Sequence, residues 1–123
     1  MTKPASSTHP WPPIIQDLLC LHEMFRRMGY EAKDLYVAEP KGGEIQFVLK
    51  EGKKTFTIDV GKVENTKKML STWAKAAAWW NEGSTERERS SIFWASEFRA
   101  HAVDIAAAMM VKGFVAPKVA LSK

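Results

Sequence analysis

The first stretch of regular apolar spacing in the chain predicts an α-helix. Its apolar residues recur at intervals of four and three positions: Ile14, Leu18, Leu21, Phe25 and Met28. These intervals place the side chains on one face of a helix, which packs against the rest of the protein. Pro13 suits the first helical turn, and Gly29 suits the position that ends a helix. We therefore expect a helix from about residue 13 to residue 28.

The apolar spacing then changes to every second residue, which is typical of β-strands. The segments EIQFVLK (44–50) and KTFTIDV (54–60) alternate between apolar and polar residues, and DLYVA (34–38) is short and strand-like. Such alternation is expected of an antiparallel sheet with one buried face and one solvated face. Gly52, in the connecting segment KEGKK, allows a tight turn. The three segments predict a three-stranded meander.

Helical spacing returns after Gly61. Asn65 or Thr66 begins a second helix that runs to about Asn81, and Thr85 with Glu88 forms the pattern of a capping box. The helix that begins there is predicted to be long, extending to about residue 112. The sequence thus predicts an α+β fold of order α-β-β-β-α-α, in which a three-stranded antiparallel meander packs against helices. Residues 13–114 form a single domain, flanked by a flexible N-terminal tail (1–12) and a C-terminal tail (115–123).

The second helix is rich in tryptophan and lysine. Helical geometry places Trp73 and Trp80 on its core face and turns Trp79 about 100° away, toward Lys68 and Lys75. An aromatic ring beside lysines is suited to stacking on nucleic-acid bases. Alternatively, the third helix or the C-terminal tail covers Trp79.

The apolar residues of the third helix cover about half of its circumference, which is more than a surface helix needs. This wide arc predicts burial on two sides, one of them against a second copy of the chain. Arg99 lies within the arc, where a carboxylate at a dimer interface would pair with it, or its side chain reaches water along the helix edge. The predicted self-association residues are Ile92, Phe98, Arg99, Met109 and Met110.

Charge adds a second candidate surface. The chain has 123 residues and a net charge of +4, and segment 50–75 contains seven lysines against three acidic residues. A basic segment attracts nucleic acid or an acidic protein, although lysine runs also commonly solvate an exposed face. The candidate binding residues are Lys67, Lys68, Lys75 and Trp79.

The order α-β-β-β-α in the first 81 residues resembles the connectivity of double-stranded-RNA-binding domains. Within it, TKKMLSTWAKAAAW (66–79) is similar to the lysine-rich start and alanine-rich body of the last helix of that family. The resemblance implies binding of duplex RNA. A further long helix follows in this chain.

Residue types that carry chemistry do not form a motif in this sequence. Glu97, His101 and Asp104 would share one face of the third helix, as a solvated face or a weak metal or acid–base candidate. Cys20 and His22 point about 160° apart on the first helix and form no local pair. We predict no catalytic residue, no metal and no cofactor, while a site assembled from distant residues keeps the enzyme class open.

The sequence therefore predicts a small non-enzymatic accessory or interaction protein that forms a homodimer through its third helix, with nucleic-acid binding as the alternative. A single cysteine and the polar start of the chain favour a cytoplasmic location. The longest apolar run is too short to cross a bilayer, so we expect no membrane association.

Overall fold

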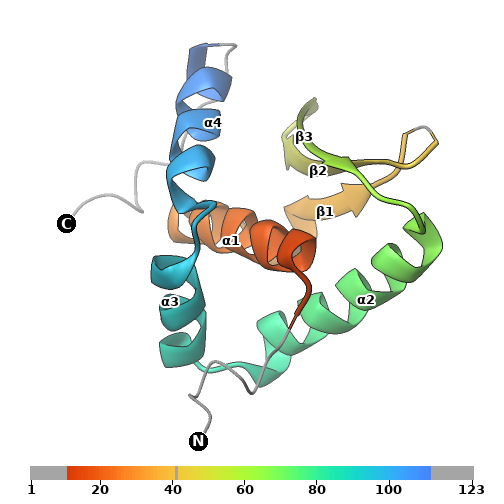
Figure 1. The fold of residues 1–123 in the computed structure, drawn as a ribbon. Helices are drawn as coiled ribbons and strands as arrows, with labels where there is room; N and C mark the ends of the chain where they lie inside the picture. The colour runs from red at the N-terminus through yellow and green to blue at the C-terminus, as the bar shows by residue number, and fades with distance from the viewer. Residues whose placement is uncertain (1–10, 41, 112–123) are drawn as a thin grey trace, which may run out of the picture.

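The computed structural model describes residues 11–40 and 42–111. For residues 109 and 110 it describes the backbone but not the side chains. The sheet consists of β1 (Leu35–Ala38), β2 (Glu44–Glu51) and β3 (Lys54–Lys62), which pair antiparallel in the order β1-β2-β3. The helices of the described part are α1 (Pro13–Arg27), α2 (Thr66–Ala78), α3 (Glu86–Ala95) and α4 (Arg99–Val111). The predicted α+β meander is confirmed (Figure 1). The number of helices differs, because the predicted third helix is two helices.

The alternating strands bury one face of the sheet, as their spacing predicts. Phe47 in the central strand is paired with Val37 of β1 and Ile58 of β3, and its side chain is fully buried. Gly52 adopts a φ of 64° in the turn between β2 and β3, a conformation that L-residues with side chains rarely adopt. The register shifts by one residue between Ile45 and Gln46, opposite Gly61, which has a φ of 134°. This bulge lets β3 continue to Lys62 rather than end at the glycine.

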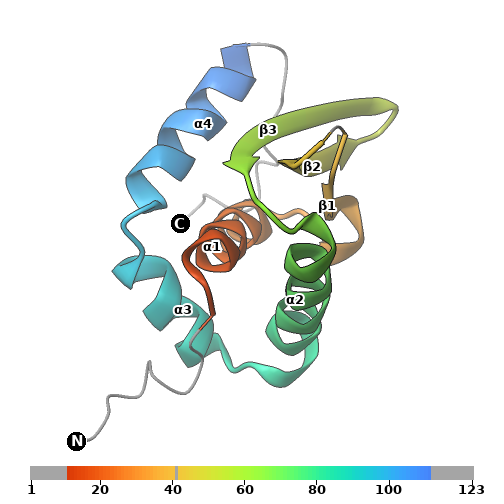
Figure 2. The same ribbon diagram turned by 45° about the vertical axis from the view of Figure 1, so that its right-hand side comes forward.

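Helix α1 lies at the centre of the molecule. All eight residues from Leu18 to Phe25 are buried, which is more than two complete turns. The sheet and α2 pack on one side of this helix, while α3 and α4 pack on the other (Figures 1 and 2). The apolar stripe predicted from the sequence is therefore only part of the buried surface of α1.

Helix α2 begins at the Asn65 cap, whose side-chain oxygen accepts a hydrogen bond from the Lys68 amide at 3.0 Å. The helix widens at its end into one π-helical turn, η3 (Trp79–Gly83). The Ser84 amide donates to the Trp79 carbonyl oxygen at 2.7 Å, and the Ser84 hydroxyl donates to the Trp80 carbonyl oxygen. Trp73 and Trp80 are buried in the core, as predicted.

The prediction of one helix from residue 85 to residue 112 is wrong, because the chain bends at Ser96–Phe98. The predicted capping box of Thr85 and Glu88 is present and begins α3. The helix then ends at Ala95, where Ser96 takes an extended conformation and its hydroxyl oxygen accepts a hydrogen bond from the Phe98 amide at 3.0 Å. A serine side chain that binds the backbone in this way competes with the helical hydrogen bond. Helix α4 therefore starts in a new direction (Figure 2).

Candidate interaction surfaces

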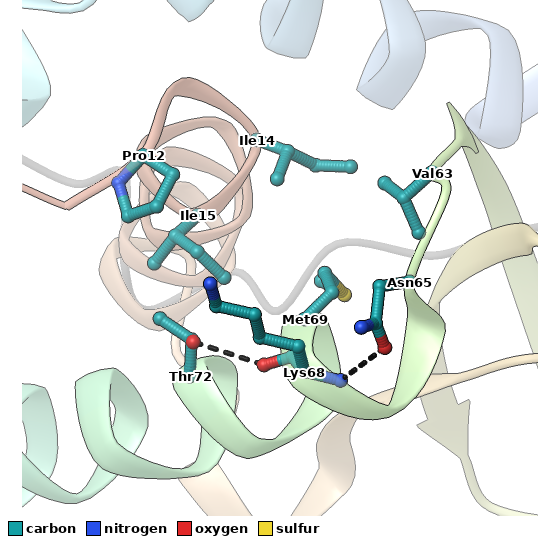
Figure 3. A pocket seen from close by; sticks show the side chains of 8 residues that line it. All are labelled: Pro12, Ile14, Ile15, Val63, Asn65, Lys68, Met69 and Thr72. Carbon is teal, nitrogen blue, oxygen red and sulfur yellow. Dashed lines mark hydrogen bonds between the residues drawn. The ribbon is translucent and has the colours of Figure 1, made fainter.

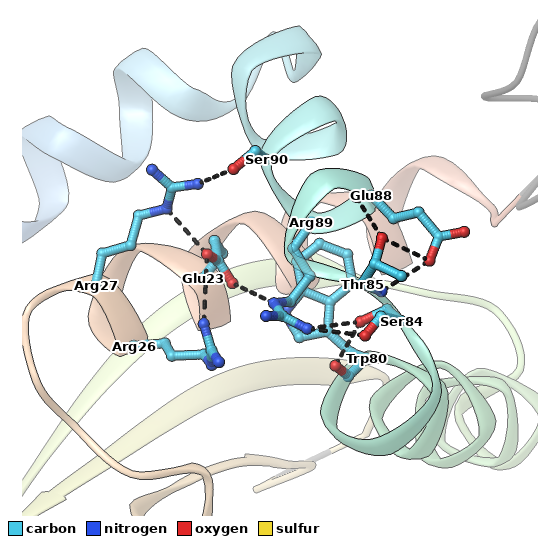
Figure 4. Close-up of polar contacts among 9 residues, drawn as sticks. All are labelled: Glu23, Arg26, Arg27, Trp80, Ser84, Thr85, Glu88, Arg89 and Ser90. Carbon is cyan, nitrogen blue, oxygen red and sulfur yellow. Dashed lines mark hydrogen bonds and ion pairs between the residues drawn. The ribbon is translucent and has the colours of Figure 1, made fainter.

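A buried glutamate holds α3 against α1 (Figure 4). The Glu23 carboxylate is almost completely inaccessible to solvent and lies among three arginines. Arg27 Nε donates a 2.9 Å hydrogen bond to Oε2, with Arg26 at 3.7 Å from the same oxygen and Arg89 Nε at 3.6 Å from Oε1. Arg89 is also buried, and its Nη1 donates to the Ser84 carbonyl and hydroxyl oxygens. This network fixes the start of α3 relative to α1.

Two arginine–aromatic contacts lie between this network and the bend at Ser96–Phe98. Arg27 Nη2 donates to the Ser90 hydroxyl at 2.7 Å, and its guanidinium lies 4.6 Å from the ring centroid of Phe93. The guanidinium of Arg99 lies 4.7 Å from the ring centroid of Trp94, which is 60% exposed. The predicted partners of Arg99 were a carboxylate or water, whereas the structure supplies an aromatic face.

The predicted self-association residues lie on α3, on the bend and on α4 rather than on one continuous helix. Ile92 and Phe98 are half-buried and pack against the domain's own core. The side chains of Met109 and Met110 lie outside the described part of the structure, although their backbone belongs to α4. The bend at Ser96–Phe98 explains why the predicted apolar arc was so wide. The arc was drawn on one continuous helix, whereas its residues belong to two helices that point in different directions.

Apart from the exposed residues His101 and Asp104, helix α4 nevertheless has an apolar outer face. It buries Ala102 and Ala106 against the core, while Val103 is 51% exposed and Val111 is 88% exposed. From Ile105 to Val111 the sequence IAAAMMV contains no charged or hydrogen-bonding side chain. A helix that is apolar on all sides is normally buried on all sides. The C-terminal end of α4 extends beyond α1 in both views (Figures 1 and 2).

The lysine-rich segment is divided between two ends of the molecule. Lys53 and Lys54 lie at the β2–β3 turn, whereas Lys62 ends β3 and Lys67 and Lys68 begin α2. The length of β3, about 26 Å for eight steps of 3.3 Å, separates the two groups. Helix α2 contains no acidic residue, and its three lysines are all exposed. The basic surface is thus the outer face of α2 rather than the whole segment.

Trp79 lies beside the core rather than on an open surface. Its ring packs 6.2 Å from Trp11 and 5.5 Å from Trp80, measured between ring centroids, and it is half-buried. Trp11 is thus the residue that packs against the exposed side of Trp79, whereas the C-terminal tail, which was one of the two predicted covers, lies outside the described residues. Trp11 belongs to the stretch predicted as a tail, so the packed part begins before residue 13. Residues 1–10 and 112–123 lie outside the described structure, and with them the rest of both predicted tails.

Cys20 and His22 are two buried titratable residues of α1 whose pKa values are shifted by burial. Burial raises the pKa of the Cys20 thiol to about 11, which leaves little nucleophilic thiolate. Burial, together with the positive charge of Arg26, lowers the pKa of His22 to about 4, so this imidazole is neutral in the folded protein. His22 is fully buried between the rings of Phe47 and Trp73.

The predicted triplet of Glu97, His101 and Asp104 is not a site of one helix, because Glu97 precedes α4 in the bend. His101 instead lies near Asp17 of α1, where burial raises the pKa of the Asp17 carboxyl and His101 partly opposes that rise. Within residues 11–40 and 42–111, no three His, Cys, Asp or Glu side chains are grouped closely enough to hold a metal ion.

Sequence reasoning missed several residues that organise these surfaces. Arg26 and Arg27 follow Glu23 at the helical spacings of three and four, which is a visible signal for ion pairing. The distant partner Arg89 has no such local signal. Phe93 was also missed, although it is the most buried apolar side chain of α3.

Comparison with known proteins does not identify a relative of this chain, so a function has to be proposed from the surfaces described above. None of the helices in the described residues is long and apolar enough to cross a membrane. No family model matches the chain, and no curated protein and no solved structure matches it either.

Proposed function

We propose that this protein is an interaction module that pairs with a second copy of itself through the outer face of α4. The observation that carries the proposal is the segment Ile105–Val111, which has no polar side chain and yet is exposed at three of its five described side chains. Val103 and Val111 are exposed on its outer face, together with Ala107 and Ala108. An apolar surface of this kind on a small domain is typical of a protein–protein contact.

The chemistry of this face favours a second copy as the partner. In a two-fold interface the same patch lies on both subunits, so each apolar contact occurs twice. Burying one valine side chain contributes about 1.5–3 kcal/mol relative to its exposed state. Ala107 and Ala108 are small, which lets a second helix approach within the usual interaxial distance of about 8–10 Å. The self-association interface predicted for a long third helix is therefore assigned to α4 alone.

Sedimentation equilibrium over a range of protein concentrations tests the proposal. We expect a monomer–dimer equilibrium, and we expect Val103→Lys and Val111→Lys each to weaken it on the order of tenfold or more. Ser71→Lys provides the matched control, because it adds the same charge at an exposed position of α2. A wild-type protein that remains monomeric at the highest concentration would overturn the proposal, as would equal weakening by Ser71→Lys.

The second candidate function is binding of nucleic acid, including duplex RNA, through the outer face of α2. The exposed lysines at 67, 68 and 75 and the absence of acidic residues on this helix favour it. Helix α1 is buried over Leu18–Phe25, which leaves α2 as the lysine-rich helix available for such a contact. Fluorescence anisotropy with a duplex RNA at two salt concentrations tests this candidate. We expect Lys67→Gln to reduce the salt dependence more than Lys53→Gln, which lies at the distant β2–β3 turn.

A further inference from the structure

A small apolar pocket lies between the start of α1 and the start of α2 (Figure 3). Its volume is about 170 Å³. The side chains of Ile15 and Met69 form its buried wall, and Val63 comes from the segment that joins β3 to α2. The complete lining is Pro12, Ile14, Ile15, Val63, Asn65, Lys68, Met69 and Thr72. The pocket is therefore built from helix starts and a strand end that the fold fixes in place.

Lys68 is the only charged residue in this lining, which contains no carboxylate. The other polar side chains already have partners: Asn65 Oδ1 accepts from the Lys68 amide, and Thr72 Oγ1 donates to the Lys68 carbonyl oxygen at 2.9 Å. Figure 3 shows the Lys68 side chain extending from α2 toward the α1 side of the pocket. Among the described residues, no acidic side chain forms an ion pair with its ammonium group. A positive charge thus lies beside an apolar cavity, and no carboxylate in the described part of the chain pairs with it.

We propose that this pocket binds a small organic carboxylate with one aromatic ring or a short alkyl chain. The apolar part of the ligand packs against Ile15 and Met69, and the carboxylate pairs with the Lys68 ammonium group. An apolar cavity of roughly 150 Å³ holds one benzene molecule, so the pocket volume suits a single ring. Ligand sites commonly combine an apolar lining with a few polar groups that orient the ligand.

The lining favours an apolar carboxylate over inorganic phosphate. Phosphate has several oxygens that need hydrogen-bond donors, whereas Ile14, Ile15, Val63 and Met69 supply none. A carboxylate with an attached ring leaves only two oxygens to satisfy, at the end of the pocket where Lys68 lies. This site lies apart from the outer face of α4, so its occupancy does not depend on the proposed self-association.

NMR titration of the isotope-labelled full chain with 3-phenylpropanoate tests the proposal. We expect saturable shifts of the backbone amides of the pocket residues, with a dissociation constant on the order of 1 mM or lower. The neutral 3-phenylpropanamide, which has the same ring and chain, should bind at least about tenfold more weakly. Inorganic phosphate at the same concentrations should produce no saturable shifts at these residues.

Two variants separate the charge of Lys68 from the general charge of α2. Lys68→Met removes the ammonium group, keeps an unbranched apolar stem, and should weaken 3-phenylpropanoate about tenfold while leaving the amide ligand unaffected. Lys75→Met removes an equally exposed charge outside the pocket and should change neither affinity. The proposal is overturned by an absence of saturable shifts, by equal affinity for acid and amide, or by equal effects of the two variants. It is also overturned if phosphate binds the pocket as well as the acid does.

Discussion

Glu23 of α1 and Arg89 of α3 are buried opposite each other, with Arg89 Nε 3.6 Å from Glu23 Oε1. The two residues come from helices that are separated in the chain by the whole sheet and α2. Their contact joins α3 to the central helix through charges, in addition to the apolar packing of Phe93. Removing one member of such a pair leaves the other buried without compensation, which is strongly destabilising.

We therefore expect Glu23→Gln to lower the free energy of unfolding by about 3 kcal/mol. The amide keeps the shape of the carboxylate but leaves the arginines around it without a negative charge. Urea unfolding followed by tryptophan fluorescence measures the loss. Glu31→Gln is the control, because Glu31 is exposed and its ion pair with Lys33 lies in solvent. A Glu23→Gln variant no less stable than Glu31→Gln would contradict the proposed role of the network.

The bend between α3 and α4 provides a second prediction. Ser96→Ala removes the acceptor of the Phe98 amide and should cost about 1 kcal/mol, as for other lost helix caps. Ser91→Ala, at an exposed position within α3, should cost no more than about 0.5 kcal/mol. Denaturant unfolding of the two variants makes the comparison, and equal stabilities would show that the hydroxyl does not hold the bend.

The contact between Arg99 and Trp94 is also measurable. A double-mutant cycle with Arg99→Met and Trp94→Leu should give a coupling energy of about 0.5–1 kcal/mol, because the ring is more than half exposed. The unfolding free energies of the wild type, both single variants and the double variant supply the cycle. Additive effects would exclude a cation–π contribution at this position.

Burial of His22 predicts a loss of stability in mild acid. Its pKa is lowered from 6.5 to about 4 in the folded protein, so the unfolded chain binds a proton more readily. Stability is therefore complete above about pH 6.5 and declines as the pH falls toward 4, by up to about 1.4 kcal/mol per pH unit from this group. Urea unfolding at pH 7 and pH 5 measures the decline. His101→Asn, which changes an exposed histidine, should retain it, whereas His22→Gln should reduce it.

The local patterns of the sequence were sufficient to predict most elements. The spacing of Leu18, Leu21 and Phe25 and the alternation around Phe47 and Ile58 depend only on the periods of helices and strands. Burial of both faces of α1 was not predicted, because one face carries polar residues such as Glu23. A polar residue of this kind is buried only when a distant part of the chain supplies its partner. Glu23 meets Arg89 only after the 65 residues between them in the chain have folded.

The broken third helix shows where periodicity misleads. Ile92 and Phe98 fit one continuous helix by spacing, and only the hydrogen bond from the Phe98 amide to Ser96 separates them into two. The candidate surfaces were predicted less well than the elements. The lysines of segment 50–75 are close in sequence but lie at opposite ends of β3. The pocket beside Lys68 joins residues from three separate segments, and no single stretch of sequence indicates it.

The enclosure of α1 also determines how the protein can be divided. A fragment that stops at Gly83 retains the α-β-β-β-α order but lacks α3 and α4. The side of α1 that these two helices bury would therefore be exposed. Leu19, Cys20 and Glu23 would then meet water or other chains, so such a fragment should aggregate rather than form an autonomous small domain. In native-state hydrogen exchange, the amides of Leu18–Phe25 should be among the slowest, opening only with global unfolding. Helix α1 precedes its covering helices in the chain and is thus completely buried only after α3 and α4 have packed against it.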